Sequence, residues 1–109
     1  MPTAYKILGQ SSPVANTTAN VYTVPAATQA VVSTIVICNR GTANASYHIA
    51  AQPSGAALSN SHYIAFNSAV SSNDSIALTI GVTLSATDVL SVNASSNTIT
   101  FSIFGSEIT

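Results

Sequence analysis

The sequence predicts an all-β protein, a single antiparallel β-sandwich of about eight strands with immunoglobulin-like or jelly-roll strand order. Three observations support this fold class. Apolar residues alternate with small polar residues at a period of two, turn-forming residues recur about every 8 to 12 positions, and no segment has the 3.6-residue apolar period of a helix. A chain of 109 residues is also the usual length of one domain.

Turn residues rich in Ser, Asn, Gly and Pro separate the predicted strands. Pro25 and Pro53 mark strand ends, because proline cannot donate a hydrogen bond to a neighbouring strand. The predicted strands cover residues 4–9, 20–24, 29–39, 44–52, 61–68, 74–83, 87–94 and 97–105.

The first strand contains the apolar residues Tyr5, Ile7 and Leu8 and is followed by the polar spacer SSPVANTTAN. This spacer divides the domain into an N-terminal arm with the first strand (1–20) and the main part of the sandwich (21–109). We expect the arm to reach a neighbouring subunit, because its apolar residues precede a flexible connection.

The third strand contains VVSTIVIC, which is apolar at both odd and even positions. This pattern predicts the central strand of a sheet, covered by a layer on each face. The strand ends in the turn Asn39-Arg40-Gly41. Arg40 is the only arginine in the chain, and we expect it to contact solvent or a partner at an interface.

The fourth and fifth strands show the alternation of half-buried strands. Tyr47 lies in the core-facing phase and His48 in the opposite phase. In the fifth strand, strict alternation places Tyr63 and Asn67 on one face and Phe66 on the other. An outward-facing Tyr63 is a candidate for a partner contact or for stacking on a sugar ring.

The last three strands complete the sandwich. In 74–83 the residues at even positions, from Ile76 to Val82, are apolar, and the final two strands form a hairpin across Ser95-Ser96. Phe104 is out of phase with Phe101 and the other core-facing residues of the last strand. A straight strand leaves Phe104 exposed as an intersubunit contact, whereas a bulge near Gly105 returns it to the core.

Composition excludes several classes of partner. Charged residues are 5% of the chain and the formal net charge is −1, while Ser, Thr, Asn and Ala make up more than half of the residues. Two basic residues cannot neutralise a run of phosphates, so we expect no nucleic-acid partner. The longest apolar run is far shorter than the roughly 20 residues of a membrane span, so we expect no membrane partner.

The ionisable residues predict no catalytic or cofactor site. Cys38, His48 and an aspartate can be written as a nucleophilic triad, but a buried cysteine and a surface histidine on separate strands explain these residues more simply. The two histidines do not form a metal-ligand pattern, and no glycine-rich loop for phosphate is present. We expect no enzyme activity, no metal and no other cofactor.

Blocks along nearly the whole chain resemble one family. They are YKILGQSSP, VYTVPAATQAVVSTIVICNR, HYIAFNSAV with NDSIALTIGVTLSATDVLSV, and FSIFGSEI. These blocks resemble small virion structural proteins of tailed bacteriophages, especially of phages of cyanobacteria. The resemblance implies a β-sandwich carried on the outside of a phage particle, without an enzymatic role.

We therefore expect a capsid decoration (cement) protein that stabilises the shell from outside and contacts the major capsid protein or other virion proteins. The alternatives are a tail, neck or fibre-associated protein and a carbohydrate-binding module that contacts the host surface. A net charge near zero favours association, so we expect a homo-oligomer, with a trimer favoured. The candidate interface residues are Tyr5, Ile7, Leu8, Arg40, Tyr63 and Phe104.

The expected location is the virion, after synthesis in the host cytoplasm. The start MPTAYKILGQ lacks an apolar core of signal-peptide length. Cys38 is the single cysteine, so no disulfide can form within the chain, as is usual for proteins made in a reducing compartment.

Overall fold

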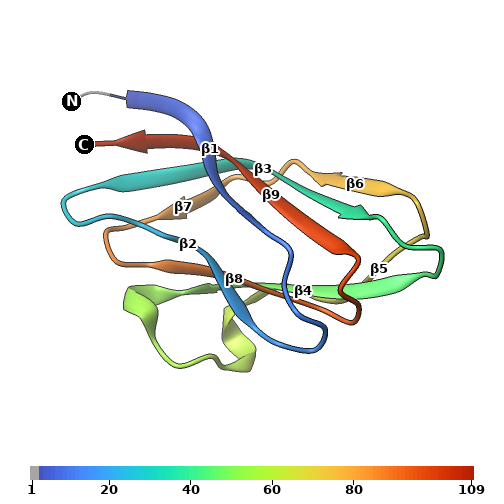
Figure 1. The fold of residues 1–109 in the computed structure, drawn as a ribbon. Helices are drawn as coiled ribbons and strands as arrows, with labels where there is room; N and C mark the ends of the chain where they lie inside the picture. The colour runs from blue at the N-terminus through green and yellow to red at the C-terminus, as the bar shows by residue number, and fades with distance from the viewer. Residues whose placement is uncertain (1–2) are drawn as a thin grey trace.

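A computed structural model describes residues 3–109, which form two antiparallel sheets packed face to face (Figure 1). The predicted all-β sandwich is thereby confirmed. One sheet has the order β1-β9-β3-β6, with β7 also paired to β3, and the other has the order β2-β8-β4-β5. The strands are β1 (Thr3–Ser11), β2 (Ala19–Thr23), β3 (Gln29–Asn39), β4 (Ala45–Gln52), β5 (Tyr63–Val70), β6 (Ser75–Leu78), β7 (Val82–Leu84), β8 (Val89–Ala94) and β9 (Ile99–Ile108).

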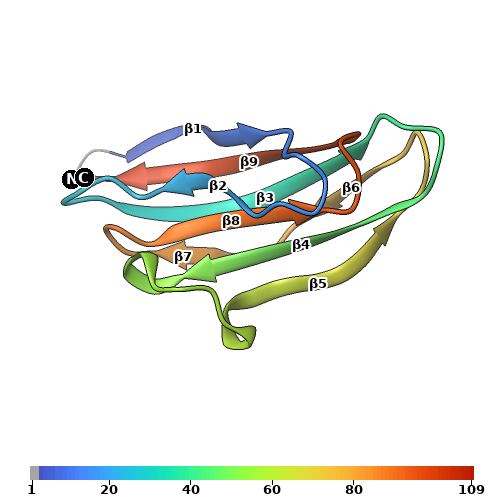
Figure 2. The same cartoon turned by 60° about the horizontal axis from the view of Figure 1, so that its bottom comes forward.

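The strand order is that of a jelly roll. The first strand pairs with the last (β1 with β9), β2 pairs with β8, β3 pairs with β6 and β7, and β4 pairs with β5. This nesting is that of one long hairpin rolled into two sheets, and Figure 2 shows β1 beside β9 in one sheet and β8 beside β4 in the other. It decides between the two strand orders that the sequence left open.

The core lies between the inner faces of the two sheets. Its largest fully buried side chains include Phe101, Ile35, Ile49 and Leu90, which come from strands of both sheets. Tyr47 is buried as predicted and meets Phe101 edge to face at a centroid distance of 6.1 Å. Such aromatic pairs add to the hydrophobic gain from burial and help to hold the two sheets together.

The third strand is central in its sheet, but only one of its faces is covered. Val32, Ile35 and Ile37 are fully buried, whereas Val36 and Cys38 are half-buried on the outer face. The prediction of a second covering layer was therefore wrong for residues 3–109. Apolar residues on both faces of this strand leave an apolar outer surface on the sheet.

The predicted strand 74–83 is divided into β6 and β7. Leu78 of β6 pairs with Ile35, and Val82 of β7 pairs with Val32. Two residues of β3 therefore lie opposite three residues, 79–81, and the regular ladder is interrupted there. The last strand, in turn, is longer than predicted and continues to Ile108, because β1 and β3 both pair with it up to that residue.

A buried asparagine joins four segments at one end of the sandwich. Asn39 is completely buried, and its Nδ2 donates to the carbonyl oxygens of Ala43 (2.9 Å) and Val70 (3.3 Å). Its Oδ1 accepts from the Gly41 N–H and the Thr98 hydroxyl, both at 2.9 Å. The side chain thus connects the end of β3 with the β3–β4 turn, the end of β5 and the β8–β9 turn.

We predict that Asn39→Ala lowers the free energy of unfolding by about 3 kcal/mol, because it removes four hydrogen bonds and leaves buried polar groups without partners. Urea denaturation measures this loss. The control Asn20→Ala, at an exposed position of β2, should change the free energy by less than about 0.5 kcal/mol. Equal effects of the two substitutions would show that the Asn39 hydrogen bonds add no net stability.

Candidate functional site

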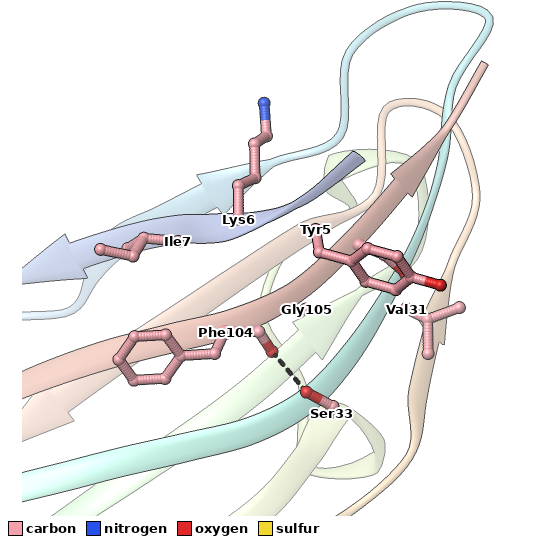
Figure 3. A pocket seen from close by; sticks show the side chains of 8 residues that line it. Tyr5, Lys6, Ile7, Val31, Ser33, Phe104 and Gly105 are labelled. Atoms are coloured by element: carbon pink, nitrogen blue, oxygen red, sulfur yellow. Dashed lines mark hydrogen bonds between the residues drawn. The ribbon is translucent and has the colours of Figure 1, made fainter. Parts of the chain in front are cut away.

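An apolar groove runs over the outer face of the sheet that contains β1, β9 and β3. It has a volume of about 630 Å³ and is lined by Tyr5 and Ile7 of β1, Phe104 of β9, and Val31 and Ser33 of β3 (Figure 3). Tyr5 is 85% exposed and Ile7 is 53% exposed. Three of the predicted interface residues therefore meet on one surface.

Phe104 faces the groove because β9 runs straight while both of its neighbours bulge. Val32 pairs with Gly105 and Thr34 with Phe104, so the extra residue, Ser33, lies in β3. The alternative of a bulge in β9 that returns Phe104 to the core is therefore wrong: the bulges lie in the neighbouring strands, and Phe104 is half-buried on the outer face. The Ser33 hydroxyl donates to the Phe104 carbonyl at 3.2 Å, which holds the bulge against β9.

Gly105 allows the close approach of strands at this bulge. A Cβ atom at this position would lie 2.0 Å from the carbonyl oxygen of Val31, too close for any side chain. Glycine is therefore required where β3 bends around β9.

The bulge in β1 separates Leu8 from the other two N-terminal candidates. Ile7 pairs with Phe104 and Gly9 with Ile103, so Leu8 is the extra residue. Leu8 is half-buried and packs against the core. It therefore contributes to folding of the subunit, whereas Tyr5 and Ile7 remain on the surface.

Lys6 binds within its own chain. Its ammonium group lies 2.6 Å from a carboxylate oxygen of Glu107, the one ion pair within residues 3–109, and the Tyr22 hydroxyl donates to the other oxygen. The bonds from Lys6 and then Tyr22 hold the pKa of the Glu107 carboxyl below its usual value. Burial, followed by the nearby carboxylate, raises the pKa of the Tyr22 phenol well above its usual range.

Arg40 is exposed and also has partners within the chain. Its guanidinium donates to the Ser12 hydroxyl (3.2 Å) and to the Asn97 carbonyl oxygen (3.0 Å). It therefore joins the segment after β1 to the β8–β9 turn. Both positive side chains of the protein thus connect the N-terminal segment to the rest of the sandwich.

A second surface feature, which we call the aromatic cluster, lies on the outer face of the other sheet. It consists of His48 on β4 with Tyr63 and Phe66 on β5. The ring centroids of His48 and Phe66 are 4.4 Å apart, those of Tyr63 and Phe66 are 4.8 Å apart, and those of His48 and Tyr63 are 5.7 Å apart. Phe66 is 63% exposed, so the cluster presents an aromatic surface to solvent.

Two irregularities in β5 bring these rings together. The pairing skips Ile64 between Ala50–Tyr63 and Ile49–Ala65, and it shifts again before Ser68. Asn67, at the second shift, has the left-handed φ of 55°, and its N–H donates to His48 Nδ1 at 2.8 Å. The prediction that Tyr63 and Phe66 lie on opposite faces was therefore wrong, because bulges re-aim side chains.

The sequence carried one signal for this arrangement. Asparagine tolerates the left-handed region better than most residues, so Asn67 within an apolar strand could have indicated a bulge. The role of His48 as an acceptor for that backbone N–H depends on pairing between β4 and β5, which the sequence alone does not show.

The structure does not bring together Cys38 and His48, which the sequence analysis considered as members of a nucleophilic triad. Cys38 is on β3 and His48 is on β4, in different sheets, and their side chains occupy the two opposite outer faces. Within residues 3–109, no three His, Cys, Asp or Glu side chains lie close enough to share a metal ion. The helical segments of this region are single turns, Pro53–Gly55 and Asn60–His62, and none could span a membrane.

Comparison of the chain with protein-family models, with curated proteins and with solved structures found no match.

We predict that Glu107→Gln lowers the free energy of unfolding at pH 7 by about 1 kcal/mol, because it breaks the ion pair with Lys6. A carboxyl with a lowered pKa in the folded state stabilises the protein above its unfolded pKa of about 4.3. That contribution is lost as the pH falls through the lowered pKa of Glu107 in the folded protein.

Urea denaturation at pH 7 and at successively lower pH tests this prediction. The difference between the wild-type protein and the Glu107→Gln variant should shrink to about zero in acid. The double variant Lys6→Gln, Glu107→Gln should be little worse than either single variant. A difference that stays constant with pH would mean that the Glu107 charge does not stabilise the fold.

Proposed function

We propose that the protein is a structural component of a bacteriophage virion, a capsid decoration protein bound to the outside of the shell and stabilising it. The apolar groove over β1, β9 and β3 is the observation that carries a structural role. Exposed apolar side chains gathered on one face of a sheet, as Tyr5 and Ile7 are beside Phe104, are typical of protein contacts. The resemblance to virion structural proteins of tailed phages is the reason for proposing that this contact is made in a phage particle.

The chemistry of the groove suits a contact between protein subunits. Tyr5, Ile7, Phe104 and Val31 provide aromatic and aliphatic surface, and aromatic residues are enriched at the centres of interfaces. The one charge beside it, on Lys6, already has Glu107 as its partner. A partner can therefore cover the groove with little desolvation of charge.

We further propose that the occupant of the groove is a second copy of this chain, in a closed homo-oligomer. The chain has a net charge of −1, so identical copies repel one another weakly. A groove that meets a different surface of the next copy makes a heterologous contact, and a rotation that closes such contacts gives a ring, most simply a trimer. Several weak contacts of one ring with the shell then add to a strong attachment.

The jelly-roll strand order is compatible with this role. Jelly rolls occur in viral capsid domains and in lectin domains, among others. Architecture alone does not determine function, so the fold counts only as an analogy.

We predict that the double variant Tyr5→Ser, Phe104→Ser is a folded monomer, whereas the wild-type protein sediments as a trimer. Both side chains lie on the outer face, so their loss removes apolar contact area without opening the core. Analytical ultracentrifugation gives the mass, and urea denaturation checks the fold. The matched control Phe66→Ser, on the opposite sheet, should remain trimeric; a double variant that keeps the wild-type mass would contradict this use of the groove.

The copy number in purified phage particles tests the decoration role. A decoration protein should be present in hundreds of copies, near a one-to-one ratio with the major capsid protein. Quantitative mass spectrometry of particles measures this ratio. A count of three, six or twelve would instead support the tail, neck or fibre-associated role, and absence from particles would overturn both.

A further inference from the structure

The aromatic cluster of His48, Tyr63 and Phe66 lies on the opposite sheet from the groove and has no part in the proposed assembly contact. We propose that it is a binding site for a neutral carbohydrate, which stacks one pyranose ring on Phe66 and Tyr63. This proposal does not depend on the virion role, because the two surfaces belong to different sheets.

The rings are arranged to offer both a face and an edge. Tyr63 and Phe66 meet at 73°, while His48 packs behind Phe66 with an interplanar angle of 35°. Phe66 is thus supported from two sides and still 63% exposed, so little ordering is needed when a ligand binds. A supported, exposed aromatic ring is suited to the apolar C–H face of a sugar.

Polar groups lie on one side of the cluster, beside His48 and Tyr63. His48 Nδ1 accepts the Asn67 N–H, so the neutral imidazole carries its proton on Nε2 as a donor. A narrow crevice beside His48 and Tyr63 is lined by Thr18 and Asn93, and the Asn93 amide donates to the Thr18 hydroxyl at 3.2 Å. The side-chain oxygen of Asn93, Oδ1, can accept a hydrogen bond from a ligand. Apolar faces bordered by donors and acceptors match the amphipathic surface of a pyranose.

The charges of the chain favour a neutral ligand. Lys6 and Arg40 both bind partners near the N-terminal segment, so the cluster offers no cation to a phosphate or a sulfate group. Asp74 and Asp88 accept backbone N–H groups of turns, and Glu107 binds Lys6. A cationic ligand therefore finds no carboxylate at the cluster either.

The size of the cluster argues against a protein partner. Three rings supply far less area than the roughly 800 Å² that each partner contributes to a standard protein interface. One or two sugar rings can cover them. Binding by a single subunit is therefore weak, and several copies in one particle strengthen it by avidity.

The test is titration of the ¹⁵N-labelled protein with neutral hexasaccharides of glucose, mannose and galactose, followed by NMR. We expect the Asn67 N–H signal and the neighbouring amides of β4 and β5 to shift with at least one of these sugars. Phe66→Ala should weaken binding about tenfold or more. Phe66→Trp should retain it, because an aromatic ring is restored.

Controls separate this proposal from the proposed assembly contact. The Tyr5→Ser, Phe104→Ser variant should bind the same sugar with unchanged affinity per subunit, even as a monomer. Polygalacturonate and a single-stranded DNA oligonucleotide serve as anionic probes and should not bind at the cluster. The proposal is overturned by no shift with any neutral hexasaccharide, by wild-type affinity in Phe66→Ala, or by a preference for an anionic probe.

Discussion

The straight course of β9 between two bulged neighbours determines the side of the sandwich on which the surrounding residues lie. Gly105 has no Cβ, so the Val31 carbonyl can approach and β3 can take up its extra residue without disturbing β9. The phase of β9 then continues unbroken to its end. Phe101 and Ile103 enter the core, Phe104 turns outward to the groove, and Glu107 turns inward to meet Lys6 and Tyr22.

The two basic side chains of the protein are both used within the chain. Lys6 and Arg40 both bind within the chain, and each contacts or adjoins the first strand or the loop after it. What remains on the two outer faces is apolar or aromatic surface bordered by small polar residues. One face carries the apolar groove at Tyr5, Ile7 and Phe104, and the other carries the supported aromatic cluster of His48, Tyr63 and Phe66. The two proposals follow from the different chemistry of these two surfaces.

Strand positions could be predicted from the sequence because an alternation such as that of Tyr47 and His48 needs no knowledge of a partner strand. Asn67 could have indicated one bulge, but the exact positions of the bulges could not be predicted, because an extra residue is defined only by the strand opposite it. Ser33, for example, is the extra residue of β3 only relative to β9, where its hydroxyl donates to the carbonyl oxygen of Phe104, 71 positions later in the chain. The face of Phe66 depends on the bulges in β5, and the face of Phe104 depends on the straight course of β9, so both candidate surfaces depend on where bulges occur. The prediction of a layer over the outer face of β3 was wrong because the sequence does not show whether an apolar face is covered by the same chain or by another molecule.

A cryo-EM map of the phage particle at side-chain resolution is the most direct test of the account. It should place this chain on the outside of the shell, with the groove at Tyr5, Ile7 and Phe104 covered by a neighbouring copy and with Phe66 facing solvent. A map in which that groove faces solvent, or in which the shell carries no density for this jelly roll, would contradict the account.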